Sequence, residues 1–272
     1  MRKVARVRGI EVVYEDAAAD ARSPHASPVV LLHGFPFNRS LWREQVEALS
    51  ETRRVVAPDL RGHGETSVGG GPAAMEEMAE DLAALLDELE VGRAVVGGLS
   101  MGGYAALAFV RAHPERVAAL VLADTRAQAD TDDVRRTREE TARRALAEGM
   151  EPIADAIMPK LFAPATREQR PDLVARVREM ILGTKPAGAA AALRGMASRR
   201  NQTDLLETIN APTLIIVGSE DTVTPPADAE AMRAKIRGSR LVKIEGAGHV
   251  SNVERPGEFN RALAEFLGEL PA

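Results

Sequence analysis

The pattern of apolar positions along the 272 residues predicts short strands separated by helices. Continuous apolar runs are typical of strands buried on both faces of a sheet, whereas apolar residues spaced three and four apart indicate amphipathic helices. Strands are expected over 28–32, 54–57, 93–97, 117–123, 213–217 and 240–244, after an antiparallel hairpin of 4–8 and 10–14. Helices are expected over 41–50, 75–89 and 104–111. This alternation predicts an α/β fold with a mostly parallel sheet and helices on both faces.

The alternation of strands and helices stops in the middle of the chain. Residues 125–210 are rich in Arg, Glu and Ala and contain no run that predicts a strand. Prolines interrupt this region at Pro152, Pro159, Pro164, Pro171 and Pro186. We therefore expect several short helices inserted into the α/β core, which divides the chain into a first core part (1–124), a helical insertion (125–210) and a second core part (211–272).

The segment Gly98-Leu99-Ser100-Met101-Gly102 lies between an expected strand and an expected helix. Small residues beside the serine suit a sharp strand-to-helix turn, because the backbone before and after the serine approaches closely there. Such a turn presents Ser100 as a nucleophile, and the alternative is a serine that only caps the helix. A P-loop is excluded because no Lys follows the glycines, and the spacing differs from the dinucleotide-binding fingerprint.

A nucleophilic serine needs a base and an acid that orients the base. His249 follows the last expected strand in Gly246-Ala247-Gly248-His249, and Asp221 follows the strand over 213–217. Both loops lie at the carboxyl ends of strands, on the same edge of the sheet as Ser100. The order Ser100, Asp221, His249 suits a serine hydrolase triad. Asp124, which also ends a strand, competes for the role of the acid.

Two backbone amides are candidates for stabilising an oxyanion. Phe35 lies in a loop after the strand over 28–32, and Met101 follows the nucleophile. We expect His33 to anchor that loop through hydrogen bonds rather than to act in catalysis. The segment 59–64 is expected to form a structural turn held by an Asp–Arg pair. His33 and His63 lack the spacing of known metal-binding motifs, so no metal site is predicted.

Composition narrows the class of protein. The net charge is -5 and the sequence pI is about 5.7, which disfavours nucleic acid as a partner. No stretch reaches the length of a membrane span, and the basic N-terminus lacks the apolar core of a signal peptide. The absence of cysteine excludes thiolate chemistry and disulfides. We expect a cytoplasmic protein without a cofactor, and whether it forms a homo-oligomer stays open.

These motifs together resemble those of the α/β-hydrolase-fold serine hydrolases, in the branch of carboxylesterases, enol-lactonases, carbon–carbon bond hydrolases and perhydrolases. The matching segments are His33-Gly34-Phe35-Pro36, Asp59-Leu60-Arg61-Gly62-His63-Gly64, Gly98-Leu99-Ser100-Met101-Gly102-Gly103, Gly218-Ser219-Glu220-Asp221 and Gly246-Ala247-Gly248-His249. The resemblance implies an eight-stranded sheet and a helical cap formed by the insertion. Haloalkane dehalogenases and epoxide hydrolases of this fold use Asp as nucleophile, which disfavours both for this chain.

The expected reaction is hydrolysis of small carboxylic esters with short acyl chains, through an acyl-enzyme intermediate. A lactonase similar to 3-oxoadipate enol-lactonases, a cofactor-free perhydrolase and a ligand-binding receptor on a hydrolase fold are the alternatives. Arg126, Arg199 and Arg200 are the cations that could hold a substrate carboxylate near the mouth of the site. Apolar residues of the insertion are expected either to line the pocket or to pack against the core: Met150, Ile153, Ile157, Met158, Leu161, Phe162, Met180, Leu182 and Met196.

Overall fold

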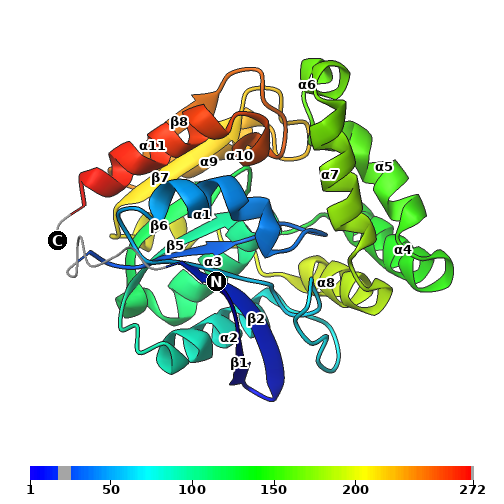
Figure 1. The fold of residues 1–272 in the computed structure, drawn as a ribbon, viewed down its shortest axis with the longest axis horizontal. Coiled ribbons are helices and arrows are strands. Elements are labelled where there is room, and N and C mark those ends of the chain that lie inside the picture. Colours follow the sequence, from blue (N-terminus) through cyan, green and yellow to red (C-terminus); the bar gives the residue numbers. More distant parts are fainter. Residues whose placement is uncertain (18–25, 271–272) are drawn as a thin grey trace.

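The computed structural model of the chain describes residues 1–17 and 26–270. Its central feature is an eight-stranded sheet with the strand order β1-β2-β4-β3-β5-β6-β7-β8 (Figure 1). The strands are β1 (Arg2–Val7), β2 (Ile10–Ala17), β3 (Val29–Leu32), β4 (Val55–Pro58), β5 (Ala94–Leu99), β6 (Val117–Ala123), β7 (Thr213–Gly218) and β8 (Arg240–Ile244). Among the described strands, β2 pairs antiparallel with β1 and with β4, and the other neighbouring strands are parallel. The predicted α/β fold with a mostly parallel sheet is confirmed.

The central strands are buried on both faces. Alternate residues of β3 belong to different hydrophobic clusters: Val30 packs on the side of α2 (Met75–Glu88) and α3 (Met101–Ala112), and Leu31 packs on the opposite side. That opposite side is covered by α1 (Arg43–Leu49) and α11 (Pro256–Gly268), while α9 (Pro226–Lys235) joins the first cluster. This double burial explains why the strands are continuous apolar runs.

Residues 125–210 contain helices and no strand, as the sequence predicts. Figure 1 shows α4 to α8 gathered at one end of the molecule. They are α4 (Asp132–Glu148), α5 (Glu151–Leu161), α6 (Pro164–Gln169), α7 (Pro171–Leu182) and α8 (Pro186–Ser198). Pro164, Pro171 and Pro186 each occupy the first helical position, where a missing N–H costs nothing. The expected interruption at Pro159 is wrong, because this residue lies inside α5, two residues before the helix ends.

Most apolar side chains of the insertion pack against other apolar residues. Met150, Ile153, Leu161 and Phe162 are buried in the cluster that also holds α1 and α11, and Met196 is buried in the other cluster. Of the two expected roles, lining the pocket or packing against other apolar residues, these five residues therefore show the second.

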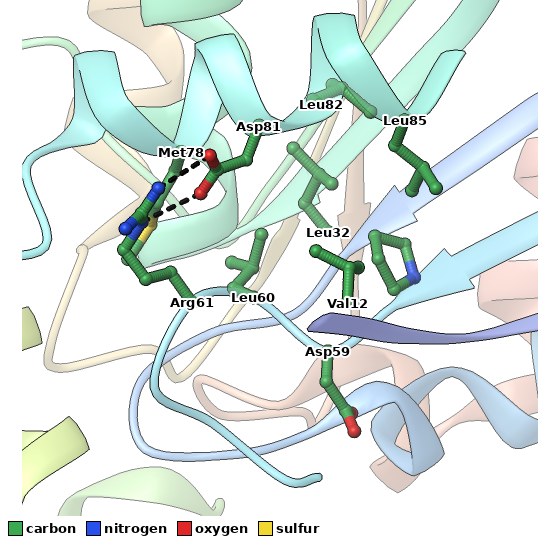
Figure 2. A pocket seen from close by; sticks show the side chains of 10 residues that line it. Val12, Leu32, Asp59, Leu60, Arg61, Met78, Asp81, Leu82 and Leu85 are labelled. Atoms are coloured by element: carbon green, nitrogen blue, oxygen red, sulfur yellow. Dashed lines mark hydrogen bonds and ion pairs between the residues drawn. The ribbon is translucent and has the colours of Figure 1, made fainter. Parts of the chain in front are cut away.

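The turn over 59–64 is held differently from the expected Asp–Arg pair. Arg61 forms a bidentate pair with Asp81 of α2, with distances of 2.6 and 2.8 Å, and Figure 2 shows the two side chains facing each other beside a pocket. Asp59 instead pairs with Arg39 and accepts a hydrogen bond from the Glu65 amide at 2.9 Å. The expected Asp59–Arg61 pair is wrong. Arg61 pairs with Asp81 and Asp59 pairs with Arg39, and both partners come from outside the turn.

No helix among the described residues is long and apolar enough to cross a membrane.

Candidate active site

Ser100 lies in a strained turn between β5 and α3. Its backbone has φ 54° and ψ -113°, a conformation that is rare for a residue with a side chain. The turn is held by two hydrogen bonds, because the Ser100 N–H donates to the Ala123 carbonyl (3.0 Å) and the Thr125 hydroxyl donates to the Ser100 carbonyl (2.8 Å). Strain retained in this way is typical of a functional residue.

The glycines beside Ser100 allow the close backbone contacts of the turn. A Cβ atom on Gly98 would lie 2.2 Å from the Gly102 carbonyl oxygen, and one on Gly102 would lie 2.0 Å from the carbonyl oxygen of Leu32. Both distances are far below van der Waals contact. The start of α3 therefore packs directly against the end of β3, and only glycine fits at these two positions.

His249 connects the serine to a carboxylate. The Ser100 hydroxyl lies 2.9 Å from His249 Nε2, and His249 Nδ1 lies 2.8 Å from Asp221 Oδ2. Three loops that follow β5, β7 and β8 bring these side chains together. All three are buried, and His249 is 3% exposed. Because both ring nitrogens are occupied, the imidazole is held in one orientation.

The electrostatics of His249 and Asp221 favour a charged pair. Burial by itself lowers the pKa of His249, but the Asp221 carboxylate outweighs burial and raises that pKa above its usual value. For Asp221, burial acts to raise the pKa, and the imidazole together with hydrogen bonds lowers it overall. Asp221 Oδ1 accepts from the amides of Val223 (2.7 Å) and Thr224 (3.0 Å), and Oδ2 accepts from the Thr224 hydroxyl (2.7 Å).

Asp124 has different partners from Asp221, and they belong to the segments that carry Asp221 and His249. Its Oδ1 accepts from the Gly218 amide at 2.8 Å, and its Oδ2 accepts from the Ser251 hydroxyl at 2.6 Å. Burial, reinforced by the charge of Asp221, raises the pKa of Asp124 to about 8. Asp124 therefore links the two loops, while the hydrogen bond to His249 comes from Asp221.

Phe35 and Met101 present their backbone amides near Ser100. Within the part of the chain that the structure describes, neither N–H donates to a protein acceptor. Met101 is the first residue of α3, where helix amides lack an internal partner. The loop that carries Phe35 lies against the nucleophile, because a Cβ atom on Gly34 would be 3.3 Å from Ser100 Cβ.

His33 holds this loop in place, as expected. Its Nδ1–H donates to the Gly34 carbonyl, and its Nε2 accepts from the Leu60 amide, both at 2.9 Å. Burial lowers the pKa of His33 to about 4 and that of His63 to about 3, so both rings are neutral at pH 7. The rings contact each other edge to face, with centroids 5.1 Å apart.

The candidate cations are largely paired with carboxylates. Arg126 lies 3.2 Å from Asp228 and donates to the Val223 carbonyl. Arg199 is 2.6 Å from Asp130 and lies over the ring of Tyr104, and Arg200 is exposed. Arg126 and Arg199 thus each lie beside a carboxylate within the protein, and Asp130 also pairs with Arg138.

Sequence reasoning missed three polar side chains that surround the base. Thr224 and Ser251 bind the two aspartates, and Glu254 accepts from the amide of Gly248, next to His249. Each follows a motif residue by two to five positions, and no local pattern distinguishes it from a solvated loop residue.

Comparison with known proteins places this geometry in a family. Residues 27–256 match the model of the alpha/beta hydrolase fold. The chain is 31% identical over 230 residues to 3-oxoadipate enol-lactonase 2 of Acinetobacter baylyi, covering 85% of this chain and 84% of that protein. A thermophilic esterase from Thermogutta terrifontis, solved with malate bound, is 40% identical with a TM-score of 0.95, and each chain is covered completely (100%).

An enol-lactonase from Burkholderia xenovorans LB400 has a TM-score of 0.91 at 32% identity, over 98% of this chain and 100% of that one. The chain therefore belongs to the α/β-hydrolase fold family, in the branch of the esterases and enol-lactonases.

Proposed function

We propose that this carboxylic ester hydrolase cleaves small esters with Ser100 as nucleophile, His249 as general base and Asp221 as the acid that orients the base. The observation that carries the proposal is the buried chain of hydrogen bonds from Ser100 Oγ to His249 (2.9 Å) and from His249 to Asp221 (2.8 Å). Distances of this size allow a proton to pass from the serine to the imidazole as the serine attacks.

The reaction begins when Ser100 Oγ attacks the ester carbonyl carbon while His249 Nε2 takes the hydroxyl proton. The carbonyl oxygen becomes an oxyanion, which the amides of Phe35 and Met101 stabilise; each such donor contributes about 3 kcal/mol in the transition state. The intermediate then expels the alcohol, which receives its proton from His249, and an acyl-Ser100 ester remains. Water, deprotonated by His249, attacks this ester and releases the acid and free Ser100.

Turnover of a chromogenic ester tests the proposal against a receptor that only binds ligands. Ser100→Ala is expected to abolish hydrolysis of p-nitrophenyl acetate, and phenylmethylsulfonyl fluoride is expected to modify Ser100 alone. Ser50→Ala, at the end of α1, is the matched control and keeps full activity. An adduct on another residue, or an active Ser100→Ala variant, contradicts the proposal.

Short-chain esters are the substrate class that we propose. Arg126 and Arg199 already lie beside Asp228 and Asp130, which weakens both guanidiniums as sites for a substrate carboxylate. The second candidate is an enol-lactone, and the similarity to two enol-lactonases favours it. Perhydrolysis would use the same groups, with hydrogen peroxide in place of water.

A further inference from the structure

Glu254 is a buried carboxyl that the proposed reaction does not use. It ends α10 (Ser251–Glu254) and is 3% exposed. Its Oε1 accepts from the Gly248 amide at 2.7 Å, and its Oε2 accepts from the Ala163 amide at 2.9 Å. Gly248 precedes the base, and Ala163 connects α5 to α6 in the helical insertion. One carboxyl group therefore binds the loop of the base and the insertion together.

The two segments that Glu254 joins also contact each other through their backbones. The His249 amide donates to the Leu161 carbonyl at 2.8 Å, so the base is hydrogen-bonded to the end of α5. A Cβ atom on Gly248 would lie 2.7 Å from the Ala163 nitrogen and 2.9 Å from the Leu161 carbonyl oxygen. The absence of a side chain at 248 is what lets the loop approach the insertion this closely.

A carboxyl in this place is costly unless it is hydrogen-bonded. Burial raises the pKa of Glu254, and hydrogen bonds from the Thr166 side chain and from the Ala163 and Gly248 amides oppose that effect. These two amides come from segments 85 positions apart in the chain, which no local turn brings together. Glu254 therefore holds the insertion and the loop of His249 in place against each other.

We propose that Glu254 is a positioning residue that holds His249 in line with Ser100 by fastening the loop of the base to the α5–α6 junction. The inference rests on the proposed function, since it assigns Glu254 an effect on the proton transfer between Ser100 and His249. Displacement of a catalytic group by about 1 Å can lower a rate about a hundredfold, so a loosened loop affects kcat more than substrate binding.

The test compares Glu254→Ala and Glu254→Gln with the wild type on p-nitrophenyl acetate, with rates expressed per site titrated by a fluorophosphonate. Glu254→Ala is expected to lose about ten- to a hundredfold in kcat with KM changed less than threefold. Glu254→Gln keeps the volume and one acceptor oxygen, so its loss is expected to be smaller. Glu258→Ala, on the exposed first turn of α11, is the matched control and keeps the wild-type kcat.

A second readout separates positioning from a purely structural role. The proton that His249 shares with Asp221 gives a downfield proton resonance, and we expect Glu254→Ala to shift or broaden it at a pH where wild type shows it sharply. If Glu254→Ala does not fold, Glu254→Gln carries both measurements. Wild-type kcat per titrated site together with an unchanged resonance overturns the inference.

The failure of this inference is distinguishable from failure of the proposed function. If wild type hydrolyses no ester, the proposed function fails, while the resonance still reports on Glu254 and His249. If wild type is active and the Glu254 variants match it in both readouts, the inference about Glu254 alone fails.

Discussion

Two buried aspartates near His249 differ in their partners, and that difference separates their roles. Asp221 accepts from two amides and a hydroxyl besides the imidazole, which favours its charged form. Asp124 is fully buried, and its pKa is raised to about 8. A charged Asp221 can stabilise an imidazolium, whereas a largely neutral Asp124 serves as a bridge.

Asp221→Asn is expected to lower kcat on the order of 10⁴-fold, because the base loses the group that fixes its tautomer. Asp124→Asn, the matched variant, is expected to change kcat less than tenfold, since an amide can still bridge Gly218 and Ser251. Steady-state kinetics on p-nitrophenyl butyrate measure both. If kcat falls further in Asp124→Asn than in Asp221→Asn, then Asp124 rather than Asp221 is the acid that orients His249.

The pH dependence of activity follows from His249, which must be neutral to accept the serine proton. Its pKa is raised in the folded protein, so kcat/KM is expected to fall on the acid side at a pH above about 6.5, the value of free imidazole. Asp221→Asn removes the charge that favours the imidazolium, and the fall is expected to move to lower pH. If kcat/KM of Asp221→Asn falls at the same acidic pH as that of wild type, Asp221 does not raise the pKa of His249.

Asp124 also predicts how stability depends on pH. The group is protonated up to about pH 8 when folded and only up to about pH 4 when unfolded, so the unfolded state binds fewer protons between these values. The free energy of unfolding of wild type is thus expected to fall relative to Asp124→Asn as pH rises from about 4 to about 8. Urea unfolding at several pH values measures the difference, and a constant difference contradicts it.

At the scale of elements, the contact between the start of α3 and the end of β3 positions both Ser100 and the Met101 amide, the proposed nucleophile and one proposed oxyanion donor. Gly102→Ala puts a methyl group 2.0 Å from the Leu32 carbonyl oxygen, so the helix must shift. We expect the free energy of unfolding to fall by about 1–3 kcal/mol and kcat to fall with it.

Thermal unfolding and kcat of Gly102→Ala are compared with those of Gly257→Ala. Gly257 lies in the first turn of α11, where a Cβ atom meets nothing within 4 Å. An alanine there is expected to leave kcat unchanged and to be neutral or slightly stabilising. Equal behaviour of the two variants would falsify the packing argument.

At the scale of the whole molecule, we propose that the insertion and the core together decide which substrates enter. Arg126 and Arg199 each lie beside a carboxylate from another segment, Asp228 and Asp130, whereas Arg200 is exposed. A guanidinium that already contacts a carboxylate gains less from a substrate carboxylate than a free guanidinium does. We therefore propose that the protein prefers neutral esters.

We expect p-nitrophenyl acetate and butyrate to be hydrolysed faster than the laurate, and an acidic enol-lactone to have no advantage over them. Arg126→Ala and the exposed Arg200→Ala are expected to change the ratio of rates for lactone and ester less than threefold. A lactone rate higher by orders of magnitude, lost in Arg126→Ala, makes the chain an enol-lactonase instead.

The sequence by itself predicts the parts that depend on local pattern. The continuous apolar runs over 117–123 and 213–217 predict buried strands, and Gly98 and Gly102 beside Ser100 predict a sharp turn because backbone contact there tolerates no side chain. Parallel strands expose their carboxyl ends on one edge, so the meeting of Ser100, Asp221 and His249 could also be predicted. The mostly parallel α/β sheet is confirmed; the division into core and insertion stays a prediction.

Only the tertiary structure decided which partners each polar group has. Asp124 and Asp221 look alike in sequence, since each follows an apolar strand. They differ in the folded protein because Asp124 accepts hydrogen bonds from the Gly218 amide and the Ser251 hydroxyl, whereas Asp221 is hydrogen-bonded to His249. Arg61 likewise pairs with Asp81 of α2 rather than with Asp59, because the packing of α2 brings Asp81 beside it. A hydrogen bond depends on distances of about 3 Å between segments far apart in the chain, and such distances are set by the packing of whole elements rather than by local pattern.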